Sequence, residues 1–123
     1  MNEEKKILLE IIGLPEKELK KSKIGILVRS TLPILLTENL LSESEIKKLQ
    51  EATYSKLTFD MNYPVLKKIN PKLSLDENRM VNYYTRYYSG IYDNDNGEYL
   101  ISSEWYERNL EYYIKWLKRK VSI

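Results

Sequence analysis

The chain of 123 residues contains no cysteine and no histidine. Without cysteine there are no disulfides, no thiolate nucleophile and no cysteine-ligated zinc or iron–sulfur centre. Without histidine the commonest general base at neutral pH and the usual nucleophilic triads are missing. The few glycines are too scattered along the chain to form a phosphate-binding loop. We therefore expect a protein that is not an enzyme and has no cofactor, no metal and no small-molecule substrate.

Long apolar runs are also missing. The longest apolar stretch, at residues 24–36, is interrupted by Arg29 and Pro33, whereas a membrane-spanning helix needs about 20 apolar residues in succession. The first residues, Met1 to Lys6, are mostly charged and lack the positive-then-apolar pattern of a signal peptide. We expect no contact with a membrane and a cytoplasmic location.

Charge of one sign is not in excess, because 20 basic residues face 18 acidic ones and the net charge is +2. A strongly basic nucleic-acid-binding domain has a pI above about 9, so any nucleic-acid contact must depend on a local patch. The length and the 42% of hydrophobic residues suit one domain with a buried core. We expect a single domain at 1–123, in which a helical part at 1–40 packs on a second part at 42–123.

Helical spacing of apolar residues predicts helices at residues 2–12 and 16–30, and Pro33 is expected to break or restart the second one. The best local signal is a capping box of Ser42 and Glu45 at the start of another helix. Leu41 and Ile46 flank this box, in the positions of a hydrophobic staple.

A further short helix is expected from Pro64 to Ile69, with the proline in its first turn. Residues 80–92 are rich in aromatic residues and contain a predicted strand. Asp93–Gly97 has the composition of a turn, and Glu98–Ser102 is expected to return as a second strand. Ser102 or Ser103 then caps a final amphipathic helix. The sequence thus predicts an α+β fold, mainly helical, with one β-hairpin.

The order of helix, turn, helix and hairpin over residues 42–102 resembles winged helix-turn-helix modules of bacterial or phage proteins. The resemblance depends on the capped helix at Ser42, the segment from Lys56 to Ile69 and the hairpin from Tyr83 to Ser102. It implies that the short helix at Pro64–Ile69 is a recognition helix, whose lysines face DNA phosphates or base edges.

Basic residues outnumber acidic ones by six to three between Thr53 and Tyr92. Our first hypothesis is a non-catalytic, DNA-associated module, such as a regulator from a bacterial defence or mobile-element system. Asp93 and Asp95 at the hairpin tip argue against it, because they would repel phosphate. The predicted nucleic-acid-binding residues are Lys56, Lys67, Lys68, Lys72, Arg79 and Arg86.

Tyrosine is unusually concentrated, since nine of the eleven tyrosines lie between residues 83 and 113. In the final helix, we predict a core face of Tyr106, Leu110, Tyr113, Leu117 and Val121. A second aromatic face is wide enough to reach the surface, where aromatic residues favour binding. Our alternative hypothesis is therefore a protein-interaction module, an inhibitor or adaptor that docks on a larger protein. Its predicted contact residues are Trp105, Tyr112, Trp116, Tyr84 and Tyr88.

Overall fold

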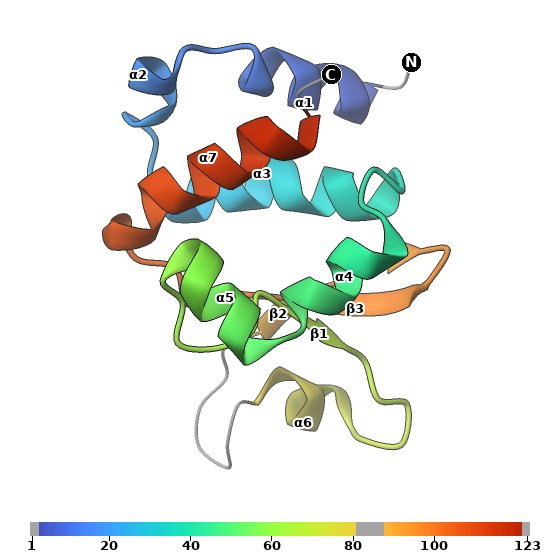
Figure 1. Cartoon of the computed structure of the whole chain (residues 1–123). Helices are drawn as coiled ribbons and strands as arrows, with labels where there is room; N and C mark the ends of the chain where they lie inside the picture. Colours follow the sequence, from blue (N-terminus) through green and yellow to red (C-terminus); the bar gives the residue numbers. More distant parts are fainter. Residues whose placement is uncertain (1–2, 81–87, 122–123) are drawn as a thin grey trace.

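The computed structural model describes residues 3–80 and 88–121, and the structural statements below concern these residues (Figure 1). They form seven α-helices, one short 3-10 helix and three β-strands. In chain order the elements are α1 (Glu3–Ile12), α2 (Glu16–Leu19), α3 (Ile24–Thr37), α4 (Glu43–Leu49), α5 (Ala52–Phe59), β1 (Leu66–Lys68), α6 (Leu75–Arg79), β2 (Tyr88–Asn94), β3 (Gly97–Ser102), the 3-10 helix η1 (Glu107–Asn109) and α7 (Leu110–Val121). The fold is α+β, as predicted, and mainly helical.

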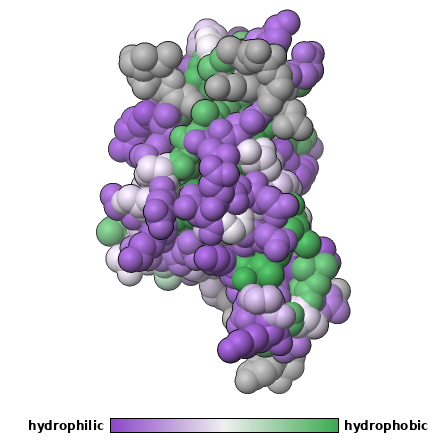
Figure 2. Space-filling view, turned by 90° about the vertical axis from the view of Figure 1, so that its right-hand side faces the viewer, coloured by the Kyte–Doolittle hydropathy of each residue, from purple (hydrophilic) through white to green (hydrophobic). Residues whose placement is uncertain are grey.

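The elements are stacked in layers (Figure 1). Helices α1 and α2 lie above α3 and α7, and below these come α4, α5 and the antiparallel sheet. Strand β3 is the middle strand of the sheet, between β1 and β2. Helix α6 forms the bottom of the molecule (Figure 1). It belongs to a narrow projection, and the surface of this projection is mostly hydrophilic with some apolar patches (Figure 2).

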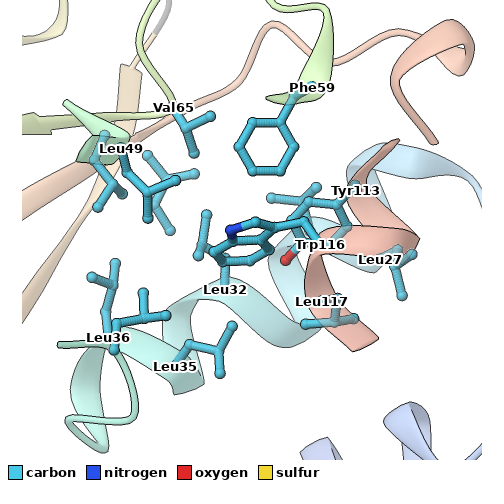
Figure 3. Packing of buried hydrophobic residues seen from close by; sticks show 14 of the residues in the cluster. Leu27, Leu32, Leu35, Leu36, Leu49, Phe59, Val65, Tyr113, Trp116 and Leu117 are labelled. Carbon is cyan, nitrogen blue, oxygen red and sulfur yellow. The ribbon is translucent and has the colours of Figure 1, made fainter. Parts of the chain in front are cut away.

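One cluster of buried side chains includes residues of both the 1–40 part and the 42–123 part. Trp116 of α7 is fully buried at its centre, with Phe59, Tyr113 and Leu32 around it (Figure 3). The rings of Trp116 and Phe59 meet edge to face with centroids 5.3 Å apart, a geometry that aromatic pairs prefer. The core thus joins α7 to α3 and α5.

The start of α4 follows the local sequence signal closely. The Ser42 Oγ accepts a hydrogen bond from the Glu45 amide at 3.2 Å, and both staple residues, Leu41 and Ile46, are buried. The Glu45 carboxylate forms an ion pair with Lys120 at 2.5 Å. The N-cap is therefore confirmed, but the predicted capping box is only half present, because the structure shows no bond from the Ser42 amide to the Glu45 side chain. A box with both reciprocal bonds occurs at the start of α6.

Serine and glutamate with the same spacing, Ser74 and Glu77, form that box. The Ser74 Oγ accepts from the Glu77 amide at 3.1 Å, and the Ser74 amide donates to the Glu77 carboxylate at 3.3 Å. The side chain of Asn78 is buried behind it and donates to the carbonyls of Asn70 and Ser74. These bonds order the projection in spite of the shortness of α6.

The prediction that Pro33 breaks the second helix is wrong. The predicted helix at 16–30 is divided into α2 and α3, and α3 continues through Pro33 to Thr37. A proline inside a helix loses one backbone hydrogen bond and costs about 3 kcal/mol. Burial of the leucines on both sides offsets this cost, since Leu32, Leu35 and Leu36 are fully buried.

The predicted short helix at Pro64–Ile69 is also wrong. Leu66–Lys68 forms strand β1, in which Leu66 lies opposite Ile101 and Lys68 opposite Tyr99 of β3. A helix of six residues is only marginally stable by itself, and pairing with β3 supplies the backbone hydrogen bonds from outside the segment. The recognition helix that the winged-helix resemblance implied is therefore absent at these residues.

The predicted hairpin is confirmed in its described part. Strands β2 and β3 pair antiparallel around a turn at Asp95 and Asn96, and the predicted strand residues 81–87 lie outside the described part of the chain. The final helix begins later than predicted, because the Trp105 indole donates to the Ser102 carbonyl at 2.8 Å and fixes a non-helical connection. Ser102 is the last residue of β3 and does not cap α7.

None of the helices at residues 3–80 and 88–121 combines the length and the apolar character that crossing a membrane requires.

Candidate interaction surface

The two adjacent lysines of the DNA hypothesis lie in strand β1, where successive side chains point to opposite faces of the sheet. The Lys67 ammonium donates to the Met80 carbonyl at 2.8 Å and lies 5.6 Å from the ring centroid of Tyr88. Burial lowers the pKa of Lys67. Lys68 is exposed, and its side chain extends along Gly97. The Lys67 ammonium is thus used within the fold, whereas the Lys68 side chain is exposed.

The other predicted DNA contacts are distributed over further elements. Lys56 of α5 is 2.8 Å from the Asp60 carboxylate, with which it forms an ion pair. Lys72 is exposed in the connection before α6, and Arg79 is half-buried at the end of that helix. Arg86 lies outside the described residues. Lys67 and Lys68 do line one open pocket of about 350 Å³, together with Gln50, Tyr63, Pro64, Leu66, Met80 and Tyr88.

Of the aromatic residues in the alternative hypothesis, Trp116 is fully buried and cannot contact a partner at the surface. Trp105 is half-buried and packs edge-on against Phe59 and Tyr113. Tyr88 is buried, and its hydroxyl donates to the Pro64 carbonyl at 2.7 Å. Tyr84 lies outside the described residues. Tyr112 is the one predicted contact that is well exposed in the described residues, at 46%.

The predicted core face of the last helix is confirmed at Leu110, Tyr113 and Leu117, which are all buried. It is wrong at Tyr106, which is 46% exposed. Tyr106 precedes η1 and α7, so the helical spacing on which the prediction depended does not apply to it. The side chain of Val121 is outside the described part.

A groove between α5 and α7 contains the most exposed large apolar side chain in the described residues. We call it the α5–α7 groove; its volume is about 470 Å³ and its lining residues are Glu16, Leu57, Thr58, Tyr112, Lys115, Lys118 and Arg119. Leu57 is 79% exposed. A second hollow of about 360 Å³, on the other side of α5, is lined by Ala52, Thr53, Lys56, Leu57, Met61 and Asn62. Leu57 thus stands between two hollows, with space for a partner on both sides.

Helical geometry explains why Leu57 points outward. Ser55 and Phe59, four residues apart on one face of α5, are both fully buried. Leu57 lies midway between them in the sequence, and therefore on the opposite face. The sequence analysis had not selected Leu57, because its exposure follows only from knowing that α5 is a helix and which of its faces packs on α7.

A buried asparagine holds the two sides of the groove together. The fully buried Asn109 donates from Nδ2 to the carbonyls of Phe59 and Asp60 at 2.9 and 3.0 Å, and its Oδ1 accepts from the Tyr106 amide at 2.7 Å. The end of α5 is thereby fixed to the start of α7.

Asp60 continues this link at the surface. It ends α5 in a left-handed conformation with a φ of 59°. Lys56 at 2.8 Å and Arg108 at 3.4 Å flank its carboxylate, and the hydrogen bond from Lys56 is the main cause that lowers the pKa of Asp60. The groove is therefore built on a frame that hydrogen bonds and ion pairs hold in place.

The charges that line the groove are mainly positive. The Lys118 ammonium donates to the carbonyls of Ile12, the last residue of α1, and of Leu14, so its hydrogen bonds are made within the fold. Nearby, Lys20 and Glu111 form an ion pair at 2.9 Å, which raises the pKa of Lys20 and lowers that of Glu111.

Two cations of α7 have no such partner. Among the described residues, Lys115 and Arg119 take part in no ion pair at contact distance. Lys115 exerts only a weaker attraction on Glu111, behind that of Lys20. Among residues 3–80 and 88–121, no three acidic side chains are grouped so that they could hold a metal ion.

Comparison of the chain with protein-family models, with curated proteins and with solved structures found no match. The geometry of the surface therefore carries the functional argument.

Proposed function

We propose that the chain is a non-catalytic protein-interaction module that docks on a larger protein through the α5–α7 groove. The observation that carries the proposal is the 79% exposure of Leu57 between two hollows. Burying a leucine side chain stabilises a complex by about 1.5–3 kcal/mol. A partner that covers Leu57 would gain this free energy at one residue.

The neighbours of Leu57 suit the centre of a protein interface. Tyr112 lines the same groove and is 46% exposed, and Arg119 lies on the same helix. Tyrosine and arginine are enriched among the residues that contribute most to binding. Because Asn109 fixes α5 to α7 beforehand, docking needs little ordering of this surface, which favours affinity.

DNA association, our first hypothesis, stays a prediction that has less support. Of its candidate residues, Lys67 is bonded to the Met80 carbonyl and Lys56 is paired with Asp60. These two cations are used within the fold, which leaves fewer charges for contacts with phosphates. We therefore place protein interaction first.

The test is site-specific crosslinking from position 57. A photoreactive amino acid replaces Leu57 in one variant and Ile26, which is 52% exposed on α3, in a matched control. The protein captured only from position 57 is then purified and titrated against the unmodified chain. We expect Leu57→Ser to weaken this binding about tenfold or more, and Ile26→Ser to leave it unchanged.

Three results would overturn the proposal. The first is equal capture from both positions, and the second is an affinity for the purified partner that does not respond to Leu57→Ser. The third is tight binding of duplex DNA at about 50 mM salt that is lost on Lys67→Glu, which would restore the DNA hypothesis. Circular dichroism of each variant verifies that the fold is intact.

A further inference from the structure

We infer that the α5–α7 groove binds an acidic protein segment that carries a large apolar side chain. The inference rests on the function proposed above and adds the chemical class of the partner. It depends on a different observation, the distribution of charge around Leu57.

The groove has an excess of positive charge. Three cations line it, Lys115, Lys118 and Arg119, against the single acid Glu16. Since Lys118 is bonded to the carbonyls of Ile12 and Leu14, the two cations that face a ligand are Lys115 and Arg119. They are four residues apart and hence neighbours on one face of α7. A segment with two nearby carboxylates would match them.

Stabilisation of α7 does not explain both charges. Cations in the last turn of a helix interact favourably with its dipole, and Lys118, Arg119 and Lys120 occupy that turn of α7. Lys115 lies before the last turn, where the effect of the dipole has fallen off. It attracts Glu111 only weakly, and Glu111 is already paired with Lys20. Its place beside Tyr112 and opposite Leu57 is better explained by a ligand in the groove.

The apolar part of the ligand follows from the other lining residues. Leu57 on the α5 side and Tyr112 on the α7 side expose apolar surface toward the same space. A volume of about 470 Å³ accommodates a few side chains of a short segment. One large apolar side chain between Leu57 and Tyr112 would bury both, with its acidic neighbours directed to Lys115 and Arg119.

A nucleic acid fits the same surface less well. A phosphate backbone needs a row of cations along its path. Of the three cations that line this groove, Lys118 is bonded to backbone carbonyls, so only Lys115 and Arg119 face a ligand. Two cations match a short acidic segment and leave the phosphates of a longer strand without partners. The exposed Leu57 also has no favourable partner in a phosphate backbone.

The experiment uses the full chain and two synthetic peptides of about 15 residues, the length at which an isolated helix becomes marginally stable. Both have leucine at helical spacing; one has glutamate at the remaining positions and its twin has lysine. Binding is measured by fluorescence anisotropy at about 50 and 200 mM salt. We expect the glutamate peptide to bind at least about tenfold more tightly than its twin, and to weaken as salt rises.

Variants locate the binding. Lys115→Glu with Arg119→Glu is expected to remove the preference for the glutamate peptide and to reverse it toward the lysine twin. The control, Lys47→Glu with Lys48→Glu on α4, changes the net charge by the same amount at two exposed residues and should leave the preference intact. Leu57→Ser is expected to weaken the binding of the glutamate peptide without changing its salt dependence.

Three outcomes would overturn the inference. If both peptides bind equally, the groove recognises apolar side chains alone, and the proposed function stands without the acidic class. If neither peptide binds, the inference of an acidic ligand is wrong, while crosslinking from position 57 still tests the proposed function independently. If a single-stranded oligonucleotide binds instead, and the α7 charge reversal abolishes this binding, the ligand is a nucleic acid.

Discussion

The hydroxyl oxygens of Thr31 and Tyr113 lie 2.6 Å apart in the buried core, where their hydrogen bond joins α3 to α7. The Thr31 hydroxyl also donates to the Leu27 carbonyl at 2.7 Å. Because its one proton is used there, the Tyr113 hydroxyl is the donor to Thr31. The two residues thus form a chain of hydrogen bonds that ends on the backbone of α3.

This order predicts unequal effects of two near-isosteric substitutions. Thr31→Val leaves the buried Tyr113 hydroxyl without its acceptor and should lower the free energy of unfolding by about 1–3 kcal/mol. Tyr113→Phe leaves Thr31 bonded to Leu27 and should cost only about 0.5–1.5 kcal/mol. Urea unfolding of both variants measures the difference. A larger loss for Tyr113→Phe would show that the donor has been assigned wrongly.

Alkaline pH should destabilise the fold through its buried tyrosines. Burial raises the pKa of Tyr113 and of Tyr88 above the ordinary value of 10.0. Below pH 10.0 both hydroxyls are protonated in the folded and the unfolded chain, and their contribution to stability is fully present. Above that pH the unfolded chain releases these protons first, so stability falls as the pH rises.

Unfolding by urea at a series of pH values above neutrality measures this loss. We expect a smaller loss in Tyr113→Phe than in the unmodified chain, because one of the responsible hydroxyls is gone. Equal slopes for the two proteins would contradict the assignment to Tyr113.

Removal of the Asn109 side chain should loosen the groove. Asn109→Ala deletes the bonds to the carbonyls of Phe59 and Asp60 and leaves the Tyr106 amide without its acceptor. We expect a loss of about 2–4 kcal/mol in the free energy of unfolding. Asn109→Asp should cost more, because a carboxylate would face two carbonyl oxygens. As a control, Asn62→Ala at an exposed position should stay within about 0.5 kcal/mol.

Gly90 illustrates a site where the backbone and a neighbouring ring both require glycine. Its φ is +77°, and a Cβ there would lie 2.5 Å from the Tyr92 ring. Gly90→Ala should therefore cost more than the about 1–2 kcal/mol of left-handed strain alone. In a Tyr92→Ala background the clash disappears and the cost of Gly90→Ala should fall toward that strain.

Gly25 provides the opposite case for the same substitution. It lies in α3 without a positive φ, and a Cβ there would be 3.5 Å from the Arg29 guanidinium, an ordinary contact. Gly25→Ala should stabilise the chain by up to about 1 kcal/mol. Thermal unfolding compares the two glycine variants. Equal effects at both positions would contradict the conformational argument.

Local signals in the sequence were reliable where the structure needs only neighbouring residues. Ser42 predicted an N-cap, and Asp93–Gly97 predicted a turn, because both depend on bonds within a few residues. The turn itself is limited to Asp95 and Asn96, and the flanking residues belong to β2 and β3. Pro33 and the Pro64–Ile69 segment were predicted wrongly, since distant partners decide their structure. Burial of the leucines around Pro33 stabilises a continuous α3, and pairing with β3 makes Leu66–Lys68 a strand.

The candidate surface could be predicted only in part. Tyr112 was selected from the excess of aromatic residues and is exposed, but Trp116, selected with it, is fully buried. Aromatic spacing along α7 does not determine which face meets α5. Leu57 could not be identified from the sequence, because one apolar residue in a polar stretch has no pattern. Its exposure depends on how α5 packs in three dimensions.

The two outer strands of the described sheet are poor templates for pairing with a strand of another molecule. Among the strands of residues 3–80 and 88–121, β3 is in the middle, and β1 and β2 form the edges. β1 has only three residues, and the register of β2 shifts between Ser89 and Tyr92. Short and bulged edge strands resist the addition of a strand from another molecule. The irregularity that places the Tyr92 ring over Gly90 thus also limits growth of the sheet. The interaction surface that we propose accordingly lies on helices and does not depend on strand addition.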